Sequence, residues 1–349
     1  MICVESIGAG EGDCLWIEYG EEECYRILID GGTRATYKQL KKRIERLPLD
    51  ARHFELLVIT HIDADHIGGV LRLLEDEGLG VTFADIWFNG LRHLGGGRTK
   101  GVMQGERLSD YLTHTASAWN GAFDGEAVVV KEEAVGVPIA LRGGVELILL
   151  SPTQEALTSL QPHWLKEMKR ATLKSRDSSE TPHPIGRRGE TLGDIDTLAK
   201  TPFESDTSLT NASSIAFLLR YEGKQMLFSG DAYATTLLET IEQYLPACES
   251  LSLDLFKVPH HGSDGNLSQA LLQRLRCHRY LISTNGARHH HPDVVAIARI
   301  LKYGGDSPTL YFNYHSHYTA VWGERGLPAQ YHYHVVYPTK NHTGVTLHF

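Results

Sequence analysis

Short apolar runs and amphipathic stretches alternate along the first part of this chain. Residues 14–19 alternate apolar with polar side chains, as a half-buried strand does, and residues 25–29 and 56–60 are nearly continuous aliphatic runs typical of buried strands. Residues 40–47 and 70–78 instead repeat leucine, isoleucine and valine at helical spacing. Strands that alternate with helices predict an α/β fold.

The same alternation resumes after residue 145. It predicts a strand over 145–150, a hairpin over 214–228 that turns at Glu222-Gly223, and strands over 253–258 and 280–283 that are each followed by a helix. This alternation fits a doubly wound sheet as well as a sandwich of two sheets covered by helices. The periodicity alone leaves the two architectures open.

Two segments interrupt the pattern and are expected to be insertions. Residues 89–107 are glycine-rich and basic, and residues 155–210 are polar with little periodicity. Long segments of this kind are usually functional or disordered. Each segment fits a solvated surface loop, and each also fits a surface beside the site that contacts phosphates. Residues 155–210 could also bind a protein partner. Their basic residues are Arg92, His93, Arg98, Lys100 and Arg107 in the first, and Lys166, Lys169, Arg170, Lys174, Arg176, Arg187 and Arg188 in the second.

Residues 310–349 are rich in tyrosine and histidine and form a C-terminal extension of the pattern. Exposed aromatic rings can stack on bases, but tyrosines that alternate along strands more often pack a sheet face. We expect packing here. The whole chain, residues 1–349, is then interpreted as a single domain.

The densest group of chemically active side chains lies in Thr60–Gly69, directly after an apolar run. It contains His61, Asp63, Asp65 and His66. The carboxyl ends of strands in open α/β sheets carry binding sites, so one loop is expected to present all four side chains together. Imidazoles mixed with carboxylates suit zinc, manganese or iron better than calcium. The alternative is a polar loop in which Asp65 caps a helix.

Three further motifs also follow apolar runs. Asp30 precedes two glycines, Asp231 stands in Ser229-Gly230-Asp231, and the pair His260 and His261 follows Pro259. Each motif alone is a weak signal because a strand that ends in Asp-Gly is a common turn. Together, and in this order, they predict the remaining ligands of one metal centre.

These motifs resemble those of the metallo-β-lactamase superfamily, and most closely the branch found at the end of ComEC-type DNA-uptake proteins. The matching segments are 10–13, 29–32, 60–69, 211–214, 229–232 and 257–263, with a weaker match over 282–292. The resemblance implies an αββα sandwich with metal-dependent hydrolase activity. Asp63 stands where the superfamily usually has a second histidine, and Asn211 or Ser213 stands where a third-motif histidine is expected; both departures are features of the ComEC-like branch.

We hypothesise a site for two divalent metal ions, Zn²⁺ or Mn²⁺. His61, Asp63 and Asp231 would hold the first ion, and Asp65, His66, Asp231 and one of the two adjacent histidines would hold the second. Asp231 would bridge the ions because a carboxylate has two oxygens. We prefer His260 as the metal ligand because it lies nearer the strand end. His261 would then support the ligand without contacting the metal ion. Such a pair activates a water as hydroxide and clamps the oxygens of a phosphate.

Other residues are candidates for catalysis or substrate binding around these ligands. We expect catalytic roles for Asp65, Asp30 and His291. Asp30 would orient a metal ligand, or would only close its turn. His291 would protonate the leaving group or bind phosphate, or would simply be a solvated histidine. The expected substrate contacts are Asn211, Ser213 and Ser263.

Composition limits the function and the compartment. The five cysteines form no CxxC pair, which favours reduced thiols in the cytoplasm, and the acidic N-terminus is unlike a signal peptide. No apolar run is long enough to span a membrane, so we expect a soluble, free-standing protein without the DNA-uptake role. The net charge of −9 counts mildly against binding to nucleic acid, although bound metal ions would reverse the sign locally.

Three functions remain at this stage. The leading one is a metal-dependent phosphodiesterase, specifically a nuclease that acts on DNA or RNA, as the ComEC-like resemblance implies. The second keeps the metal ions and hydrolyses a small phosphodiester, a lactone or a thioester. The third is a catalytically silent binding module of the same fold, against which the complete ligand set argues.

Overall fold

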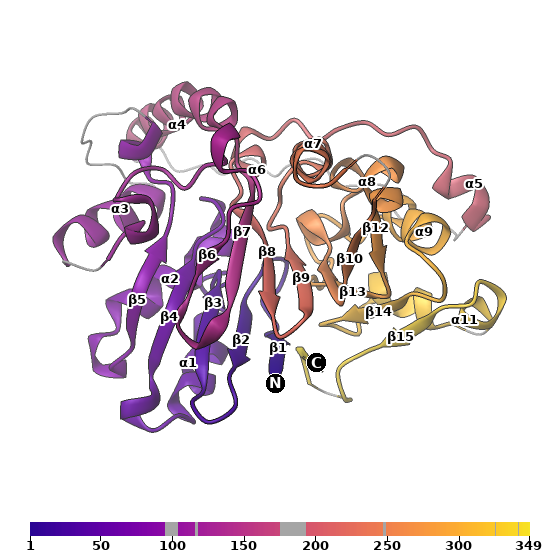
Figure 1. Ribbon diagram of the computed structural model, residues 1–349, viewed down its shortest axis with the longest axis horizontal. Helices are drawn as coiled ribbons and strands as arrows, with labels where there is room; N and C mark the ends of the chain where they lie inside the picture. The colour runs from indigo at the N-terminus through magenta and orange to yellow at the C-terminus, as the bar shows by residue number, and fades with distance from the viewer. Residues whose placement is uncertain (95–103, 116–117, 175–192, 247–248, 325, 341) are drawn as a thin grey trace.

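The computed structural model contains two β-sheets packed face to face. It describes residues 1–94, 104–115, 118–174, 193–246, 249–324, 326–340 and 342–349. Within these residues, one sheet has six strands and the other has eight. Figure 1 shows the N-terminal half of the chain on one side of the molecule and the C-terminal half on the other, with both termini close together.

The first sheet is built almost entirely from the N-terminal part of the chain. Its order is β16-β1-β2-β3-β4-β5, in which β3, β4 and β5 run parallel and the remaining neighbours antiparallel. The last strand of the chain pairs with the first, Cys3 opposite His348. The strands are β1 (Ile2–Ser6), β2 (Leu15–Tyr19), β3 (Tyr25–Ile29), β4 (His53–Val58), β5 (Thr82–Trp87) and β16 (Val345–His348).

The second sheet has the order β15-β14-β13-β11-β9-β8-β7-β6. Strands β9, β11, β13, β14 and β15 are parallel to one another, and β6 to β9 are joined antiparallel. Its strands are β6 (Ile139–Ala140), β7 (Glu146–Ser151), β8 (Ala216–Tyr221), β9 (Lys224–Phe228), β11 (Leu255–Lys257), β13 (Arg279–Ile282), β14 (Thr309–Phe312) and β15 (His334–Val336); β10 (Leu251–Leu253) and β12 (Leu275–Cys277) form a separate parallel pair.

Three hydrophobic layers hold the sandwich together. The middle layer lies between the sheets and joins side chains such as Ile17 and Val58 to Phe217 and Leu281. On the outer face of the first sheet, a second layer packs under α1 (Tyr37–Glu45), α2 (Ala64–Glu75), α3 (Gln104–His114) and α4 (Gln154–Lys174). A third layer packs the second sheet under α5 (Ile195–Ala199), α7 (Ala234–Tyr244), α8 (Gln269–Arg274) and α9 (Val294–Tyr303).

This arrangement is the αββα sandwich, so the predicted fold class is confirmed and the doubly wound sheet is excluded. The predicted strands and helices are present, each displaced by a few residues at its ends. Among the described residues, no helix is long and apolar enough to cross a membrane.

The expectation of an aperiodic segment over 155–210 is wrong at its start. Residues 154–174 form the helix α4, because Leu157, Leu160 and Trp164 follow one another at intervals of three and four residues and are buried against the first sheet. Pro162 inside this helix and the many polar residues hide the repeat in the sequence. Most of the basic side chains noted there, and Arg98 and Lys100 of the other insertion, lie outside the residues whose side chains are described.

The described basic residues of the 89–107 segment contact the protein itself. The guanidinium of Arg92 lies 3.7 Å from the ring centroid of Trp119, and Arg107 pairs with Glu75 on α2. In the C-terminal extension, Phe312, Trp322 and Tyr333 are buried in the third layer, as the packing interpretation expects.

Candidate metal centre

Four strands of the two sheets end at one place and bring the motif residues together. Asp30 follows β3, the His61–His66 loop follows β4, Asp231 follows β9, and the two histidines follow β11. Since β3 and β4 are neighbours in one sheet, and β9 and β11 in the other, both sheets contribute to a single cluster. Helix α2 begins inside the motif, with Asp63 at its N-cap.

The backbone at this place is held in uncommon conformations. Asp30, His260 and His261 have φ angles of 57°, 44° and 56°, in the left-handed region that favours glycine. Gly12 is also required, since a Cβ there would lie 1.6 Å from the carbonyl oxygen of Asp65. Such conformations cost free energy and gather at functional sites, where the surrounding structure enforces them.

Four side chains surround one position in the cluster: Asp65, His66, Asp231 and His261. The Nε2 of His66 lies 3.3 Å from the Nε2 of His261, 3.4 Å from the Oδ2 of Asp231 and 3.9 Å from the Oδ2 of Asp65. The Nε2 of His261 lies 3.6 Å from Asp231 and 3.7 Å from Asp65. Four ligands bound tetrahedrally at about 2.0–2.2 Å from one zinc ion would be about 3.3–3.6 Å apart. The distances among His66, His261 and Asp231 match this range and Asp65 lies slightly farther from both histidines, so the group is close to the geometry that one divalent ion requires.

A second position lies beside the first and shares Asp231. The Nε2 of His61 is 3.6 Å from the Oδ2 of Asp231 and 3.7 Å from the Oδ2 of Asp63. His61 and Asp231 are buried, whereas the Asp63 side chain is 42% exposed. This set offers fewer ligands and a more open side than the first.

Two buried atoms of the cluster have no hydrogen-bond partner within the described residues. They are the Nε2 of His61 and the Oδ1 of Asp231. A buried polar atom without a partner is costly, so these two atoms point to a bound group that satisfies them. Groups of three metal-capable atoms lie within 4.8 Å of one another here, and their donors are imidazoles and carboxylates. The residues present thus fit divalent metal ions.

Electrostatics within the cluster also favour a cation. Burial alone would raise the pKa of Asp231, but His66, His261 and His260 around it hold that pKa well below its usual value. Burial lowers the pKa of His66, yet Asp231 and Asp30 together raise it well above the ordinary value. The Asp231 carboxylate therefore stays ionised, and a metal ion can supply the positive charge beside it in place of protons on the histidines.

Asp30 supports the cluster from behind. It is fully buried, and its Oδ2 lies 2.8 Å from the Nδ1 of His66, which leaves the Nε2 of that ring facing the cluster. The backbone N–H and the hydroxyl of Thr60 donate to the two oxygens of Asp30 at 2.8 and 2.7 Å. Asp30 is therefore placed to fix the tautomer and orientation of His66, as a carboxylate behind a metal-binding histidine does.

Of the two adjacent histidines, His261 faces the cluster, whereas we expected His260 to do so. His261, not His260, has its Nε2 in the four-membered group, while its Nδ1 lies 2.9 Å from the carbonyl oxygen of Ser283. The turn Pro259–Gly262 is left-handed at both histidines, so distance along the chain does not decide which ring points inward. The Nε2 of His260 is 3.9 Å from Asp231.

His260 belongs instead to a polar network beside the cluster. Its Nδ1 lies 2.8 Å from the Oδ1 of Asn266 and 3.4 Å from the Oδ2 of Asp206, a residue that the motifs did not indicate. Burial lowers the pKa of His260, but Asp231, Asp206 and Asn266 raise it to about 9. Burial raises the pKa of Asp206, but hydrogen bonds from His260 and its neighbours lower it to about 2.

The remaining candidates are distributed around this network. The amide nitrogen of Asn211 donates to Asp206 at 2.7 Å, and the hydroxyl of Ser213 donates to the carbonyl of Thr210 at 2.6 Å, so both side chains are engaged within the protein. Ser263 is half-buried at the end of the histidine turn. His291 stands next to His260, with 5.3 Å between the ring centroids.

Two supporting residues were not singled out from the sequence. The hydroxyl of Ser214 lies 3.2 Å from the Nδ1 of His61 and accepts a hydrogen bond from the backbone N–H of Asp231. The hydroxyl of Thr210 donates to the Oδ2 of Asp63 at 3.2 Å. Serine and threonine are too common for their spacing to have indicated either role.

A buried ion pair lies directly behind His261. The Nζ of Lys257, on β11, is 2.5 Å from the Oδ2 of Asp13, and both side chains are almost completely buried. The Oδ1 of Asp13 is 3.7 Å from the Nδ1 of His261. Asp13 and Lys257 lie in the superfamily-like segments 10–13 and 257–263, but only the folded chain brings them together.

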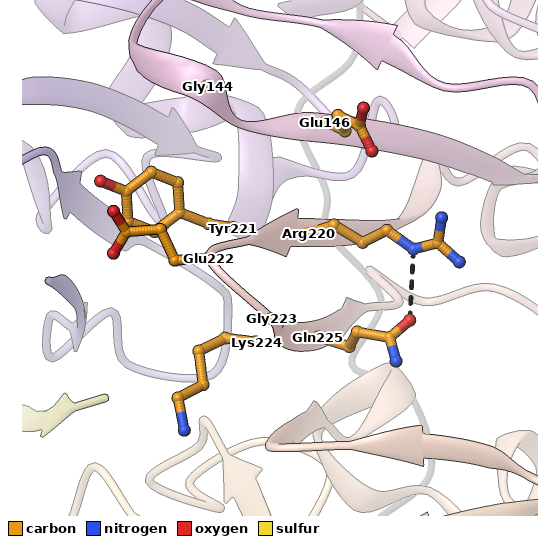
Figure 2. A pocket seen from close by; sticks show the side chains of 8 residues that line it. All are labelled: Gly144, Glu146, Arg220, Tyr221, Glu222, Gly223, Lys224 and Gln225. Atoms are coloured by element: carbon orange, nitrogen blue, oxygen red, sulfur yellow. Dashed lines mark hydrogen bonds between the residues drawn. The ribbon is translucent and has the colours of Figure 1, made fainter.

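A cavity of about 430 Å³ lies at the β8–β9 hairpin, away from the cluster. In Figure 2, Arg220 and Gln225 are joined across the hairpin by a hydrogen bond of 3.2 Å. Strand β8 separates the two places, since Ser214 at its start touches His61 and Tyr221 at its end lines this cavity. A second cavity, of about 420 Å³, borders Asp63 and lies next to the cluster.

Comparison with known proteins agrees with the motif assignment. Residues 7–84 match the family model described as "Metallo-beta-lactamase superfamily". No curated protein sequence matches the chain. The resemblance to the superfamily is thus confirmed.

Three of the solved structures that are similar to this chain are as follows. One is the metallo-beta-lactamase fold protein YhfI from Bacillus subtilis, with 10% identity, all of both chains covered and a TM-score of 0.43. Zn²⁺-bound PqqB from Methylobacterium extorquens has 12% identity, all of both chains covered and a TM-score of 0.42. The short form of human tRNase Z has 13% identity, with 100% of this chain and 99% of that chain covered, and a TM-score of 0.42.

Proposed function

We propose that this chain, a member of the metallo-β-lactamase superfamily by the match over residues 7–84, is a metal-dependent phosphodiesterase that acts as a nuclease. The observation that carries the proposal is the pair of ligand groups that share Asp231. Their nitrogen and oxygen atoms lie 3.3–3.9 Å apart, at the point where strands of both sheets end.

The proposed ligands follow from these distances. Asp65, His66, Asp231 and His261 would hold one ion, and His61, Asp63 and Asp231 would hold the other. Bound divalent cations, Zn²⁺ or Mn²⁺, supply Lewis acidity for the hydrolysis of a phosphate ester. Two adjacent cations are the arrangement that phosphoryl chemistry uses most widely.

Other residues orient the ligands and handle protons. Asp30 keeps the proton of His66 on Nδ1, and Ser214 holds His61. His291 has its Nδ1 3.4 Å from the Oδ2 of Asp293, which leaves Nε2 to donate a proton to the leaving oxygen. His260 is held through its Nδ1 by Asp206 and Asn266, which leaves its Nε2 to contact a substrate next to it. Ser263 and Asn211 lie at the edge of this place. Among the described residues, the buried Oδ1 of Asn211 has no hydrogen-bond partner and the Ser263 side chain makes no hydrogen bond, so both are available to contact substrate.

The nuclease assignment rests on the likeness to the ComEC-type branch, whose departures Asp63 and Asn211 are present in this chain. A second candidate is hydrolysis of a small phosphodiester, which the net charge of −9 favours. Both candidates use the same ligands and differ only in the substrate.

The test uses labelled single- and double-stranded DNA and RNA with metal-stripped protein that is re-supplied with manganese, zinc or magnesium. The control is the Asp63→Ala, Asp65→Ala double variant. We expect cleavage that requires metal and is lost in the variant. Hydrolysis of bis-p-nitrophenyl phosphate without cleavage of any polynucleotide would favour the small substrate, and no hydrolysis of either by metal-loaded protein would refute the proposal.

A further inference from the structure

We infer that the cavity beside Asp63 is a subsite for a planar heteroaromatic ring, the nucleobase adjoining the scissile phosphate. This inference rests on the proposed function, since it assigns a part of the same substrate. The cavity has a volume of about 420 Å³, within the range of small-ligand pockets. Its lining comes from the motif loop and from helices α3 and α4, which the superfamily motifs do not include.

The position of the cavity connects it to the more open metal position. Asp63 forms part of its wall, and the Oδ2 of Asp63 is 3.7 Å from the Nε2 of His61. Thr210 also lines the cavity and donates a hydrogen bond to the same Oδ2 at 3.2 Å. The Asp63 side chain is 42% exposed although Asp231 beside it is only 3% exposed. A phosphate at the cluster would therefore have its neighbouring group at the mouth of this cavity.

The lining of the cavity is partly apolar and includes two aromatic rings, those of His163 and Trp164. Ile62 and Ala64 form apolar walls, and the buried indole of Trp164 forms the floor. Gly105 allows the indole to lie against α3, since a Cβ at that position would come within 2.8 Å of the Trp164 ring. Because that indole is fully buried, the exposed ring of His163 is the aromatic surface on which a base can stack, with little dependence on sequence.

The polar atoms of the lining are a donor and an acceptor. The Nε1 of Trp164 and the Oε1 of Gln104 are buried, and neither has a hydrogen-bond partner in the described residues. Unsatisfied buried groups of both kinds in one lining indicate a ligand that offers both an acceptor and a donor. The edge of a nucleobase does so. His163, exposed at the rim on α4, adds a second ring that can close over the base.

The test compares two esters that differ only in the base: thymidine 5′-(p-nitrophenyl phosphate) and methyl p-nitrophenyl phosphate. Each is assayed with metal-loaded wild type and with the variants Gln104→Leu and His163→Ala. His114→Ala, an exposed histidine on the neighbouring helix α3, is the matched control. Binding of uncharged thymidine and adenosine to the protein without added metal is measured by titration calorimetry, so the subsite also has a readout independent of turnover.

We expect wild type to prefer the thymidine ester by roughly 5- to 150-fold in kcat/KM, the range of one stacked base. Gln104→Leu and His163→Ala should lose most of this factor through KM and weaken nucleoside binding, with unchanged turnover of the methyl ester. His114→Ala should behave as wild type. Equal rates on both esters without nucleoside binding would overturn the subsite. If neither ester is hydrolysed, the proposed function fails, and nucleoside binding that depends on Gln104 and His163 still decides the subsite.

Discussion

The buried pair of Asp13 and Lys257 gives the sharpest energetic prediction. Replacement of Lys257 by methionine keeps the unbranched apolar stem of the side chain and removes its charge, which leaves the Asp13 carboxylate buried without its partner. At 2.5 Å, two unit charges interact with about 7 kcal/mol at an effective dielectric constant near 20. Most of that attraction offsets the desolvation of both groups, so the loss on breaking the pair is set by the stranded carboxylate, about 3–5 kcal/mol.

The assay is equilibrium denaturation followed by tryptophan fluorescence, in the presence of chelator so that metal binding does not add to stability. We expect Lys257→Met and Asp13→Asn each to lose about 3–5 kcal/mol in the free energy of unfolding. The double variant should lose clearly less than the sum, because it leaves no charge stranded. Lys302→Met, which breaks the exposed pair of Lys302 with Asp196, is the control and should leave the midpoint nearly unchanged.

Two results would refute this reasoning. Single variants as stable as wild type would mean that water or a rearranged group satisfies the remaining charged side chain. The pair of Asp13 and Lys257 would then not be sealed from solvent. Additive losses in the double variant would mean that the two side chains contribute by packing and not by their mutual charge.

Three further predictions concern metal content and pH. Asp231→Ala should lose both metal ions by elemental analysis, and retention of two ions per chain would contradict its shared role. His261→Ala should lose one ion while His260→Ala keeps two; the reverse order would restore His260 as the ligand. Burial, with Arg92 nearby, lowers the pKa of His93 from 6.5 to about 4, so the unfolded chain takes up a proton before the folded protein does as the pH falls. The folded protein keeps its full stability above pH 6.5 and loses up to about 3 kcal/mol as the pH falls towards 4. His93→Gln should lack this loss, and an equal loss in wild type and variant would contradict the prediction.

The sequence alone predicted most of the residues that the structure gathers in the candidate metal centre. His61, Asp63, Asp65 and His66 are neighbours in the chain directly after a strand, and the folded structure keeps them together because a short loop and a helix start leave them little freedom. Asp231 was identified for a related reason: it ends a strand whose parallel neighbour, β11, carries the histidine pair. The αββα fold followed from the same motifs, although periodicity left two architectures open.

The tertiary structure decided what local spacing cannot. His260 and His261 are adjacent, and the left-handed turn that both adopt determines which ring faces the cluster. Asp13 and Lys257 are far apart in sequence, so only the packing of the two sheets makes them a pair. The cavity beside Asp63 exists because α3 and α4 pack on the same face of the first sheet. Side chains linked by a few backbone bonds are placed by local geometry, whereas side-chain direction and distant partners depend on how the whole chain packs.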